Sequence, residues 1–358
     1  MKPLTALIAL LVFTVATTSP VLAGTIEKAT VERASADKVV VRWSDIDPVD
    51  VFQSDQPDST ITEAALVSAR DRGGSYEAAS ASRSGRLFFL LRDSRTGNVL
   101  RVAERALPLE RGSNFRDLGG YATRDGKHVH WGMIYRTGGQ AMLTDSDVKR
   151  LQALGIANLV DLQSDEERIL APTRLDGIAY NAVGYSISKL MSPAPGGGYA
   201  MPHMEAIYRT FPTLLTPQIR IVFRKLLSRE GPLAYNCSAG QDRTGFMTAL
   251  VLSALGVPRE TIYTDYALST ANRRPRWELP PISEAMAASS PVAAMLAKVQ
   301  HDPAGDKPEP LISDDGVPLL AYALAEIEAR WGSIDAYLER EIGLSTQDIA
   351  TLRATYLE

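Results

Sequence analysis

One short segment of the 358-residue chain constrains its fold most: residues 236–245, with the sequence NCSAGQDRTG. The apolar run at 233–236 precedes it and predicts a short buried strand. A helical pattern from Arg243 to Leu255 follows it and is stopped by Gly256. A strand, a tight loop and a helix in this order form an anion site, because loop N–H groups and the positive helix end face one point. The segment therefore predicts a phosphate-binding loop in an α/β fold.

The loop also contains the only cysteine of the chain, Cys237, six positions before Arg243. A thiolate can attack phosphorus in line while a guanidinium holds two phosphate oxygens side by side. Cysteine is also a common buried apolar residue, but the surrounding glycine, arginine and threonine fit that interpretation poorly. We predict Cys237 as nucleophile and Arg243 as the group that stabilises the transition state. The residues predicted to bind phosphate are Ser238, Ala239, Gly240, Gln241, Asp242 and Arg243.

Phosphoester cleavage also needs an acid that protonates the leaving oxygen. Between Asp176 and Asp242 the chain contains no aspartate, so Asp242 is the first candidate. Asp161 and Asp117 remain alternatives, in which case Asp242 would brace the loop. Thr244 is predicted to hydrogen-bond the cysteine sulfur, although a hydroxyl there can also satisfy a backbone group in the first helical turn.

Composition indicates an ordinary soluble globular chain, with 45% hydrophobic and 22% charged residues and a net charge of −4. This mild acidity does not favour nucleic-acid binding. Residues 1–23 combine Lys2, an apolar run at 4–15 and a small-residue cleavage site, which predicts a secretory signal peptide. The run is too short to span a bilayer, so no stable membrane insertion is expected after cleavage. We expect a periplasmic or secreted protein, in which a lone thiol is more readily explained by reactivity.

Two domains are expected after the leader. Residues 24–107 carry strand-like runs at 38–43 and 86–92, and a turn before 99–102 indicates a hairpin. These features predict a small β-sandwich of the fibronectin type III kind, acting as a spacer or a binding platform. Residues 108–358 alternate strand and helix patterns, which predicts an α/β domain with a mostly parallel central sheet flanked by helices.

Within the second domain, Thr144 and Asp147 predict a capping box that opens a helix. A buried strand is expected at 156–162, a helix at 219–227 and a last helix at 346–356 after Ser345. Residues 192–198 and 287–316 show little periodicity, and each is expected to be either a lid or a surface linker.

Four motifs in order resemble the bacterial atypical tyrosine/serine protein phosphatases, a family of Cys-X5-Arg cysteine phosphatases. The motifs are NFRDLGGY at 114–121, YRTG at 135–138, the segment 154–164 and the loop at 236–245. The resemblance extends from about residue 108 to the C-terminus. It implies phosphomonoester hydrolysis through a phosphocysteine intermediate, with no metal or other cofactor.

Two loop positions depart from the family pattern, since most members have histidine and lysine where this chain has Asn236 and Gln241. A positive neighbour lowers the pKa of a thiol, from about 8.5 to between roughly 3.5 and 7.5. Loss of the histidine therefore predicts a less acidic thiol. Loss of the lysine predicts a less cationic pocket, which disfavours polyphosphorylated substrates.

Other charged residues carry weaker predictions. Arg116 and Asp117 are expected to form a structural ion pair or to brace the loop, and Arg136 could either brace it or touch substrate. The pair His128 and His130 lacks a third ligand, so no metal site is predicted. The basic residues Arg273, Arg274 and Arg276 either guide a phosphorylated substrate or form solvated surface.

The favoured function is that of a phosphatase acting on phosphorylated proteins, either specific for phosphotyrosine or also active on phosphoserine. A phosphatase of small or inositol phosphates and a phosphate-binding pseudo-phosphatase remain alternatives. Sulfur transfer of the rhodanese kind fits poorly, because its loops usually place one residue fewer before the arginine. The sequence makes no prediction of oligomeric state.

Overall fold

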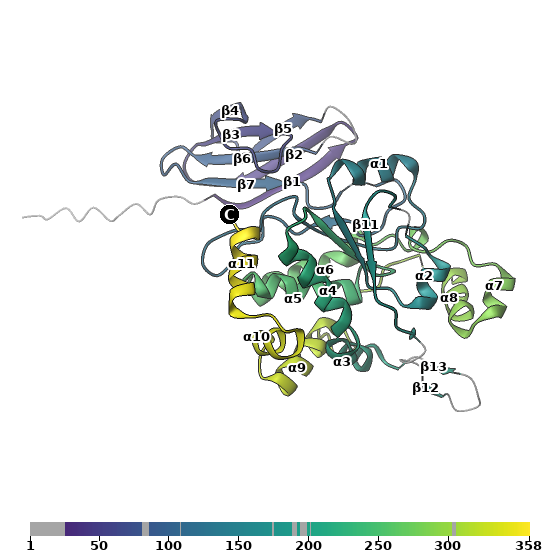
Figure 1. Ribbon diagram of the computed structural model, residues 1–358. Helices are drawn as coiled ribbons and strands as arrows, with labels where there is room; N and C mark the ends of the chain where they lie inside the picture. Colours follow the sequence, from purple (N-terminus) through teal and green to yellow (C-terminus); the bar gives the residue numbers. More distant parts are fainter. Residues whose placement is uncertain are drawn as a thin grey trace, which may run out of the picture.

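The computed structural model describes residues 26–80, 86–107, 109–173, 175–187, 192–193, 199–200, 202–302 and 306–358. The predicted leader and most of the loop at 192–198 lie outside these residues. An antiparallel β-sandwich lies beside a larger part in which helices flank a sheet (Figure 1). Among the helices described, none has the length and apolar character that crossing a bilayer would require.

The β-sandwich consists of strands β1 to β7 in two antiparallel sheets. One sheet has the order β1 (Glu27–Ser35), β2 (Lys38–Ser44), β5 (Ser75–Ala79), and the other β4 (Ala65–Asp71), β3 (Val49–Ser54), β6 (Phe88–Asp93), β7 (Val99–Ala103). Val39, Val41 and Trp43 alternate along β2 and point into the core, as period-two patterning requires. The predicted hairpin is confirmed, because β6 pairs with β7.

The larger part, residues 109–358, is called the α/β part below. Its sheet has the order β11 (Ala179–Ala182), β10 (Asn158–Asp161), β14 (Leu233–Asn236), β9 (Ile134–Thr137), β8 (Arg116–Asp117). The first four strands are parallel and only β8 is antiparallel, so the predicted mostly parallel sheet is confirmed. Asp161, Asn236 and Thr137 occupy one register level at the carboxyl ends of their strands. In open α/β sheets this edge is where ligands bind.

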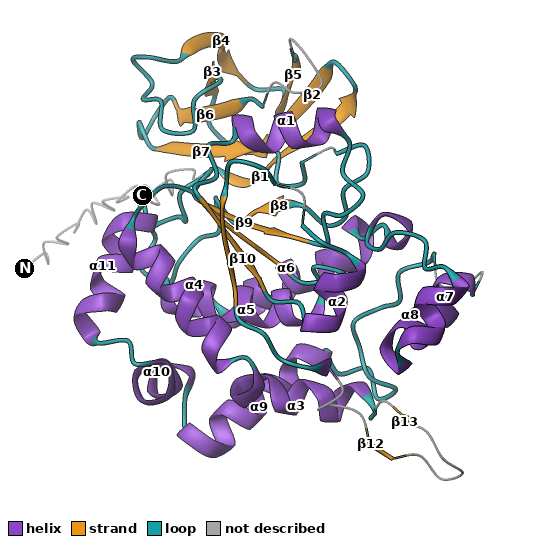
Figure 2. Cartoon of the chain, turned by 45° about the vertical axis from the view of Figure 1, so that its right-hand side comes forward, coloured by secondary structure: helices purple, strands orange, loops and turns teal. Residues whose placement is uncertain are grey.

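Different helices cover the two faces of this sheet (Figure 2). Leu159 and Ala234 face one cluster, to which α1 (Asp145–Ala153) contributes Leu151, whereas the neighbouring Val160 and Tyr235 face the main core. The main core takes residues from α3 (Met204–Leu214), α4 (Thr216–Ser228), α5 (Asp242–Ala254), α6 (Arg259–Asn272), α9 (Leu319–Trp331), α10 (Ile334–Tyr337) and α11 (Thr346–Tyr356). The remaining α-helices described are α1 (Asp145–Ala153), α2 (Asp165–Leu170), α7 (Glu284–Ser289) and α8 (Pro291–His301).

Most predicted elements occur close to their expected bounds. Both hydrogen bonds of the capping box between Thr144 and Asp147 are present, and Ser345 caps α11 as predicted. The strand expected at 156–162 is shorter, as β10. The little periodicity of residues 287–316 gave no sign of helices, but α8 and the C-terminal end of α7 lie in this segment. Serine side chains cap both helices, and their many alanines gave no clear apolar face.

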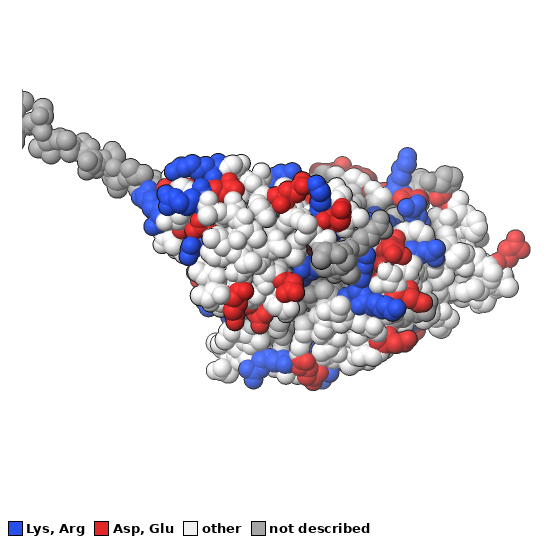
Figure 3. Space-filling view, turned by 90° about the horizontal axis from the view of Figure 1, so that it is seen from above, with Lys and Arg blue, Asp and Glu red and all other residues white. Residues whose placement is uncertain are grey.

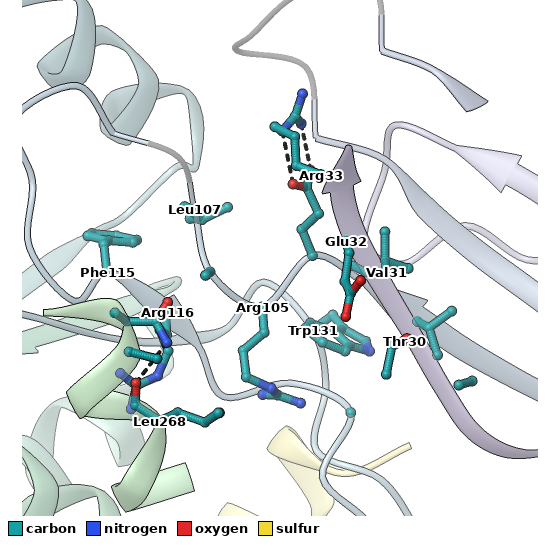
Figure 4. A pocket seen from close by; sticks show the side chains of 18 of the residues that line it. Thr30, Val31, Glu32, Arg33, Arg105, Leu107, Phe115, Arg116, Trp131 and Leu268 are labelled. Carbon is teal, nitrogen blue, oxygen red and sulfur yellow. Dashed lines mark hydrogen bonds and ion pairs between the residues drawn. The ribbon is translucent and has the colours of Figure 1, made fainter. Parts of the chain in front are cut away.

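The β-sandwich and the α/β part are joined by polar contacts. The guanidinium of Arg86, just before β6, lies 2.7 Å from Asp117 in β8, and on the sandwich side it donates to the carbonyl of Glu104 at 2.8 Å. Trp131 Nε1 donates to the carbonyl of Arg101 at 3.1 Å. A cavity of about 760 Å³ lies between the two parts, with Arg105 and the β1 residue Glu32 at its wall (Figure 4).

Charges of both signs are spread over the face seen from above the β-sandwich (Figure 3). Two exposed ion pairs on the sandwich illustrate this mixture, Lys38 with Glu77 and Arg42 with Glu32.

Candidate active site

The loop after β14 presents its N–H groups on one side. The carbonyl of Ser238 accepts from Gly139 N at 2.6 Å, and the carbonyl of Gly240 accepts from Asn114 Nδ2 and from Arg136 Nη2, each at 2.8 Å. In a trans peptide the next N–H points opposite to the carbonyl, and the described chain has no cis peptide. The N–H groups of residues 239 and 241 therefore point away from these supports, as a ring of phosphate donors must.

Gly240 is required by the shape of the loop. Its φ is +63°, and a Cβ there would lie 2.5 Å from the backbone of Thr137 and of Gly138. Gly245 in α5 is also closely packed, because its Cβ would lie 2.8 Å from the Tyr266 ring. Both glycines therefore allow a close backbone approach that no other residue permits.

The guanidinium of Arg243 is held by a carboxylate that is not among the predicted site residues. Its Nη1 and Nη2 donate to the two oxygens of Glu167 at 2.5 and 2.7 Å, and Nη1 also donates to Tyr185 Oη at 2.7 Å. Ser238 Oγ donates to the same carboxylate at 2.7 Å. Burial raises the pKa of Glu167, but Arg243 and these hydrogen bonds outweigh it and lower the pKa to about 2.

Glu167 reaches the loop because of where α2 begins. Ser164 and Glu167 form a capping box directly after β10, so the helix starts at the carboxyl edge of the sheet. The Ser-X-X-Glu pattern was present in the sequence, and its position after a predicted strand could have indicated Glu167.

Cys237 is 1% exposed at the end of β14, and the loop that follows it passes directly into α5. Burial lowers the pKa of Arg243, but the carboxylate of Glu167, the hydroxyl of Tyr185 and the charge of Cys237 raise it well above its ordinary value. The charges of Cys237 and Arg243 are thus near enough to influence each other. The hydroxyl of Thr244 is buried and has no hydrogen-bond partner among the residues described.

Asp242 is half-buried at the first position of α5. Its Oδ1 accepts from Tyr208 Oη at 2.5 Å, and this hydroxyl also contacts Tyr266 Oη at 2.6 Å. Within the described ranges no donor contacts its second oxygen, Oδ2. Asp242 is therefore held in place by one oxygen and keeps the other available.

The two alternative acids have donors on both oxygens. Asp161 accepts from Asn236 Nδ2 at 3.2 Å, from Gln163 N at 2.9 Å and from Tyr180 Oη at 2.7 Å. Burial raises its pKa. Asp117 accepts from the N–H groups of Gly119 and Gly132, both at 2.7 Å, in addition to its contact with Arg86.

Arg116 and Asp117 do not pair with each other. Arg116 lies 3.5 Å from Asp265, a second buried carboxylate, which also accepts from Arg136 at 2.5 Å. Burial raises the pKa of Asp265, but the two guanidinium groups outweigh it and lower the pKa to about 2. Since Arg136 also binds the Gly240 carbonyl, these contacts indicate the bracing role, one of the two roles predicted for Arg136.

The three arginines of the basic cluster after α6 each contact other residues of the protein. Arg273 binds Glu278 and Gln241, Arg274 Nη1 donates to the Leu109 carbonyl at 2.8 Å, and Arg276 lies over the ring of Trp277 at 5.1 Å.

Ligands for a metal are not concentrated at this loop. Among the described residues one group of three carboxylates, Asp45, Asp47 and Asp93, has oxygens close enough to share a cation, and it lies in the β-sandwich. Asp47 faces Arg95 there at 3.6 Å. Burial lowers the pKa of His128, and His130 lies 3.7 Å from Glu358.

Three features define the class of cysteine-dependent phosphatases. They are a buried cysteine after a parallel strand, a loop whose carbonyls are hydrogen-bonded to the surrounding protein, and an arginine held in place in the first turn of the helix that follows. The chain belongs to the tyrosine phosphatase family, whose profile matches residues 107–358. It is a tyrosine-phosphatase-like enzyme.

Named relatives agree with this membership. The chain is 30% identical over 258 residues to a tyrosine-protein phosphatase of Cupriavidus necator, covering 68% of this chain and 86% of that one. It is 27% identical over 280 residues to the triple specificity protein phosphatase PtpB of Mycobacterium tuberculosis, covering 68% and 96%. Among solved structures, TpbA of P. aeruginosa in complex with pTyr matches 39% of this chain and 70% of its own, at 17% identity and a TM-score of 0.25.

Proposed function

We propose that this enzyme hydrolyses phosphotyrosine in proteins through a phosphocysteine intermediate, with the loop residues in the roles expected from the sequence. The thiolate of Cys237 attacks phosphorus, so that an S–P bond forms as the P–O bond to the leaving group breaks. Arg243 and the loop N–H groups bind the three equatorial oxygens, where negative charge must be stabilised in the transition state. In this step Asp242 gives its proton to the leaving oxygen.

The second step removes the phosphoryl group from sulfur. A water molecule attacks phosphorus, Asp242 as carboxylate takes its proton, and the S–P bond breaks to release phosphate and the thiolate. The buried hydroxyl of Thr244, unpartnered among the described residues, can donate to the departing sulfur. Asp242 is preferred to Asp161 and Asp117 as the acid because only its Oδ2 lacks a donor within the part of the chain described.

The observation that carries this proposal is the bracing of the loop from outside, by Asn114, Arg136 and Gly139, together with the anchoring of Arg243. A preorganised donor ring costs no rearrangement when charge develops on the phosphoryl oxygens.

The test is hydrolysis of para-nitrophenyl phosphate at mildly acidic pH by the wild type, Cys237→Ser and Asp242→Asn. We expect no turnover in Cys237→Ser and a loss of roughly 10²–10⁴-fold in Asp242→Asn, the usual contribution of acid–base catalysis. Turnover that persists in Cys237→Ser would remove the mechanism. An undiminished Asp242→Asn enzyme would move the acid to another residue.

The alternatives separate in the same assay. A wild type without turnover that still binds phosphate would be a pseudo-phosphatase. Faster hydrolysis of alkyl or inositol phosphates than of phosphotyrosine peptides would indicate a small-molecule phosphatase. Because PtpB is named a triple specificity phosphatase, phosphoserine and phosphothreonine peptides belong in the substrate panel.

We further propose that residues 24–107 form a separate fibronectin type III-like domain and that the protein is exported after removal of residues 1–23. The three-strand and four-strand sheets, ordered β1-β2-β5 and β4-β3-β6-β7, support the first proposal. The leader pattern supports the second. Mass spectrometry of the exported protein would test it, since a mature N-terminus near Gly24 is expected.

A further inference from the structure

A second arginine, which the proposed steps do not use, lies beside the phosphate loop. Arg273 caps the C-terminus of α6, and its Nη1 donates to Gln241 Oε1 at 3.1 Å. Gln241 is the loop residue directly before Asp242, so this hydrogen bond places the guanidinium at the rim of the loop.

Arg273 is fixed in this position by a buried acid. Its Nε lies 2.9 and 3.2 Å from the two oxygens of Glu278, and its Nη2 donates at 3.0 Å. Glu278 is 6% exposed and also accepts from Ser113 Oγ at 2.8 Å. Such a fork is rigid, because planar guanidinium and carboxylate groups match each other in geometry.

The guanidinium still has donors to offer. An arginine carries five N–H groups, and these contacts occupy Nε–H, one N–H on Nη1 and one on Nη2. Within the described residues no acceptor takes the other two, and the side chain is 25% exposed. A cation with two free, oriented donors is suited to bind an anion.

The charge of Arg273 is also felt at the reaction centre. Burial lowers its pKa, but Glu278 raises it above its ordinary value, with further contributions from the charges of Asp242 and Cys237. Gln241, in place of a lysine, predicts a less cationic pocket. The structure instead places a cation from α6 against that glutamine.

Building on the proposed function, we propose that Arg273 determines specificity by binding a second anionic group, a carboxylate or a phosphate, next to the phosphoester of the substrate. Arg243 binds the phosphoryl group that is transferred, and Arg273 binds the anionic group beside it. Preferred substrates are then phosphotyrosine peptides that carry an acidic or a second phosphorylated residue adjacent to the phosphotyrosine.

The experiment compares kcat/KM for three peptides of one sequence, with alanine, aspartate or phosphoserine beside the phosphotyrosine. We expect the wild type to prefer both anionic peptides, and Arg273→Gln to lose about 10–100-fold on them, mainly through KM, as charged hydrogen bonds are lost. The alanine peptide and para-nitrophenyl phosphate should change by less than about threefold. Arg276→Gln, which removes a neighbouring cation over Trp277, is the matched control and should retain the preference.

Two further variants keep the test decisive. Arg273→Gln/Glu278→Gln avoids leaving a buried carboxylate unpaired, and it should show the same selective loss if Arg273→Gln folds poorly. Arg273→Gln/Gln241→Lys restores a cation at the rim and should recover part of the preference.

Each outcome has one meaning. Equal hydrolysis of the three peptides by the wild type would overturn the inference but leave the proposed function intact, since phosphotyrosine is still cleaved. An equal loss on all substrates in Arg273→Gln would show a purely structural role and overturn it too. A preference confined to the aspartate peptide would identify the bound anion as a carboxylate, and one confined to the phosphoserine peptide would identify it as a phosphate.

Discussion

Glu167 accepts two hydrogen bonds from Arg243, at 2.5 and 2.7 Å, and both side chains are largely buried. This bidentate pair fixes the guanidinium before any substrate arrives. A buried carboxylate that accepts two such short hydrogen bonds stays ionised. If Arg243 were removed, the negative charge of Glu167 would remain buried without a partner. The pair thus links the start of α2 to the start of α5 across the carboxyl edge of the sheet.

Glu167→Gln should therefore impair catalysis without removing any reacting group. The amide replaces one acceptor oxygen by an NH2 donor that faces a donor of Arg243, so the guanidinium becomes misplaced, and displacement of about 1 Å can cost about 10²-fold in rate. We expect a loss of this order in kcat/KM for para-nitrophenyl phosphate. Glu166→Gln is the control, since Glu166 binds Ser186 and Ile187 instead of the loop. Equal effects of the two substitutions would contradict the anchoring role.

The same carboxylate predicts how stability depends on pH. The pKa values of Glu167 and Asp265 are about 2 in the folded protein, below their ordinary values of 4.5 and 3.8. A lowered folded pKa contributes stability above the unfolded value, and this contribution is lost as pH falls towards the folded value. The contribution of these two carboxylates to the free energy of unfolding should thus be constant near neutral pH and fall between about pH 5 and 2. Urea unfolding across this range measures it, and Glu167→Gln should show a shallower fall.

The sequence predicted those parts of the site that are local in the chain. Cys237, Arg243 and the helix after them follow from residue spacing within ten positions. The contacts that hold the loop come from distant segments, as with Asn114 binding the Gly240 carbonyl and Glu167 binding Arg243. Spacing says nothing about such pairs, because only the order of the strands in the sheet brings them together.

The partners of charged residues could not be predicted from the sequence either. An ion pair between Arg116 and Asp117 was one of the roles predicted from the sequence, but adjacent residues in β8 point to opposite faces of the sheet. Asp117 therefore turns to Arg86 and Arg116 turns to Asp265. Likewise, Gln241 alone predicts a pocket with less positive charge. The sequence does not show that Arg273, at the end of α6, donates to this glutamine.

Gly240→Ala should disrupt the loop for two separable reasons. The residue adopts φ +63°, and the added Cβ would lie 2.5 Å from the backbone of Thr137. Gly126→Ala is the matched control, because Gly126 has φ +82° with no atom within 4 Å of the added Cβ. The control should lose only about 1–2 kcal/mol of stability and keep its activity. Gly240→Ala should lose nearly all turnover in hydrolysis of para-nitrophenyl phosphate, and a fully active Gly240→Ala enzyme would contradict the close packing of Gly240 against Thr137.

The contact between Arg86 and Asp117 predicts that the β-sandwich stabilises the motif that follows it. Arg86 comes from the sandwich with a side chain only 8% exposed, and Asp117 is fully buried and also orders Gly119 and Gly132. Removing one partner of a buried pair costs about 3–5 kcal/mol, since the other charge stays buried without compensation.

Arg86→Met should therefore lower the free energy of unfolding by several kcal/mol, about 3–5 by this argument. Arg42→Met is the control, because Arg42 pairs with Glu32 at the surface, where both side chains are more than half exposed, and such pairs contribute about 0–1 kcal/mol. Denaturant titration followed by tryptophan fluorescence reports both variants, since Trp131 packs against Phe88 and Ala103 between the two parts. If the two substitutions had equal effects, the buried contact would carry no special weight, and the sandwich would be a passive neighbour of the α/β part.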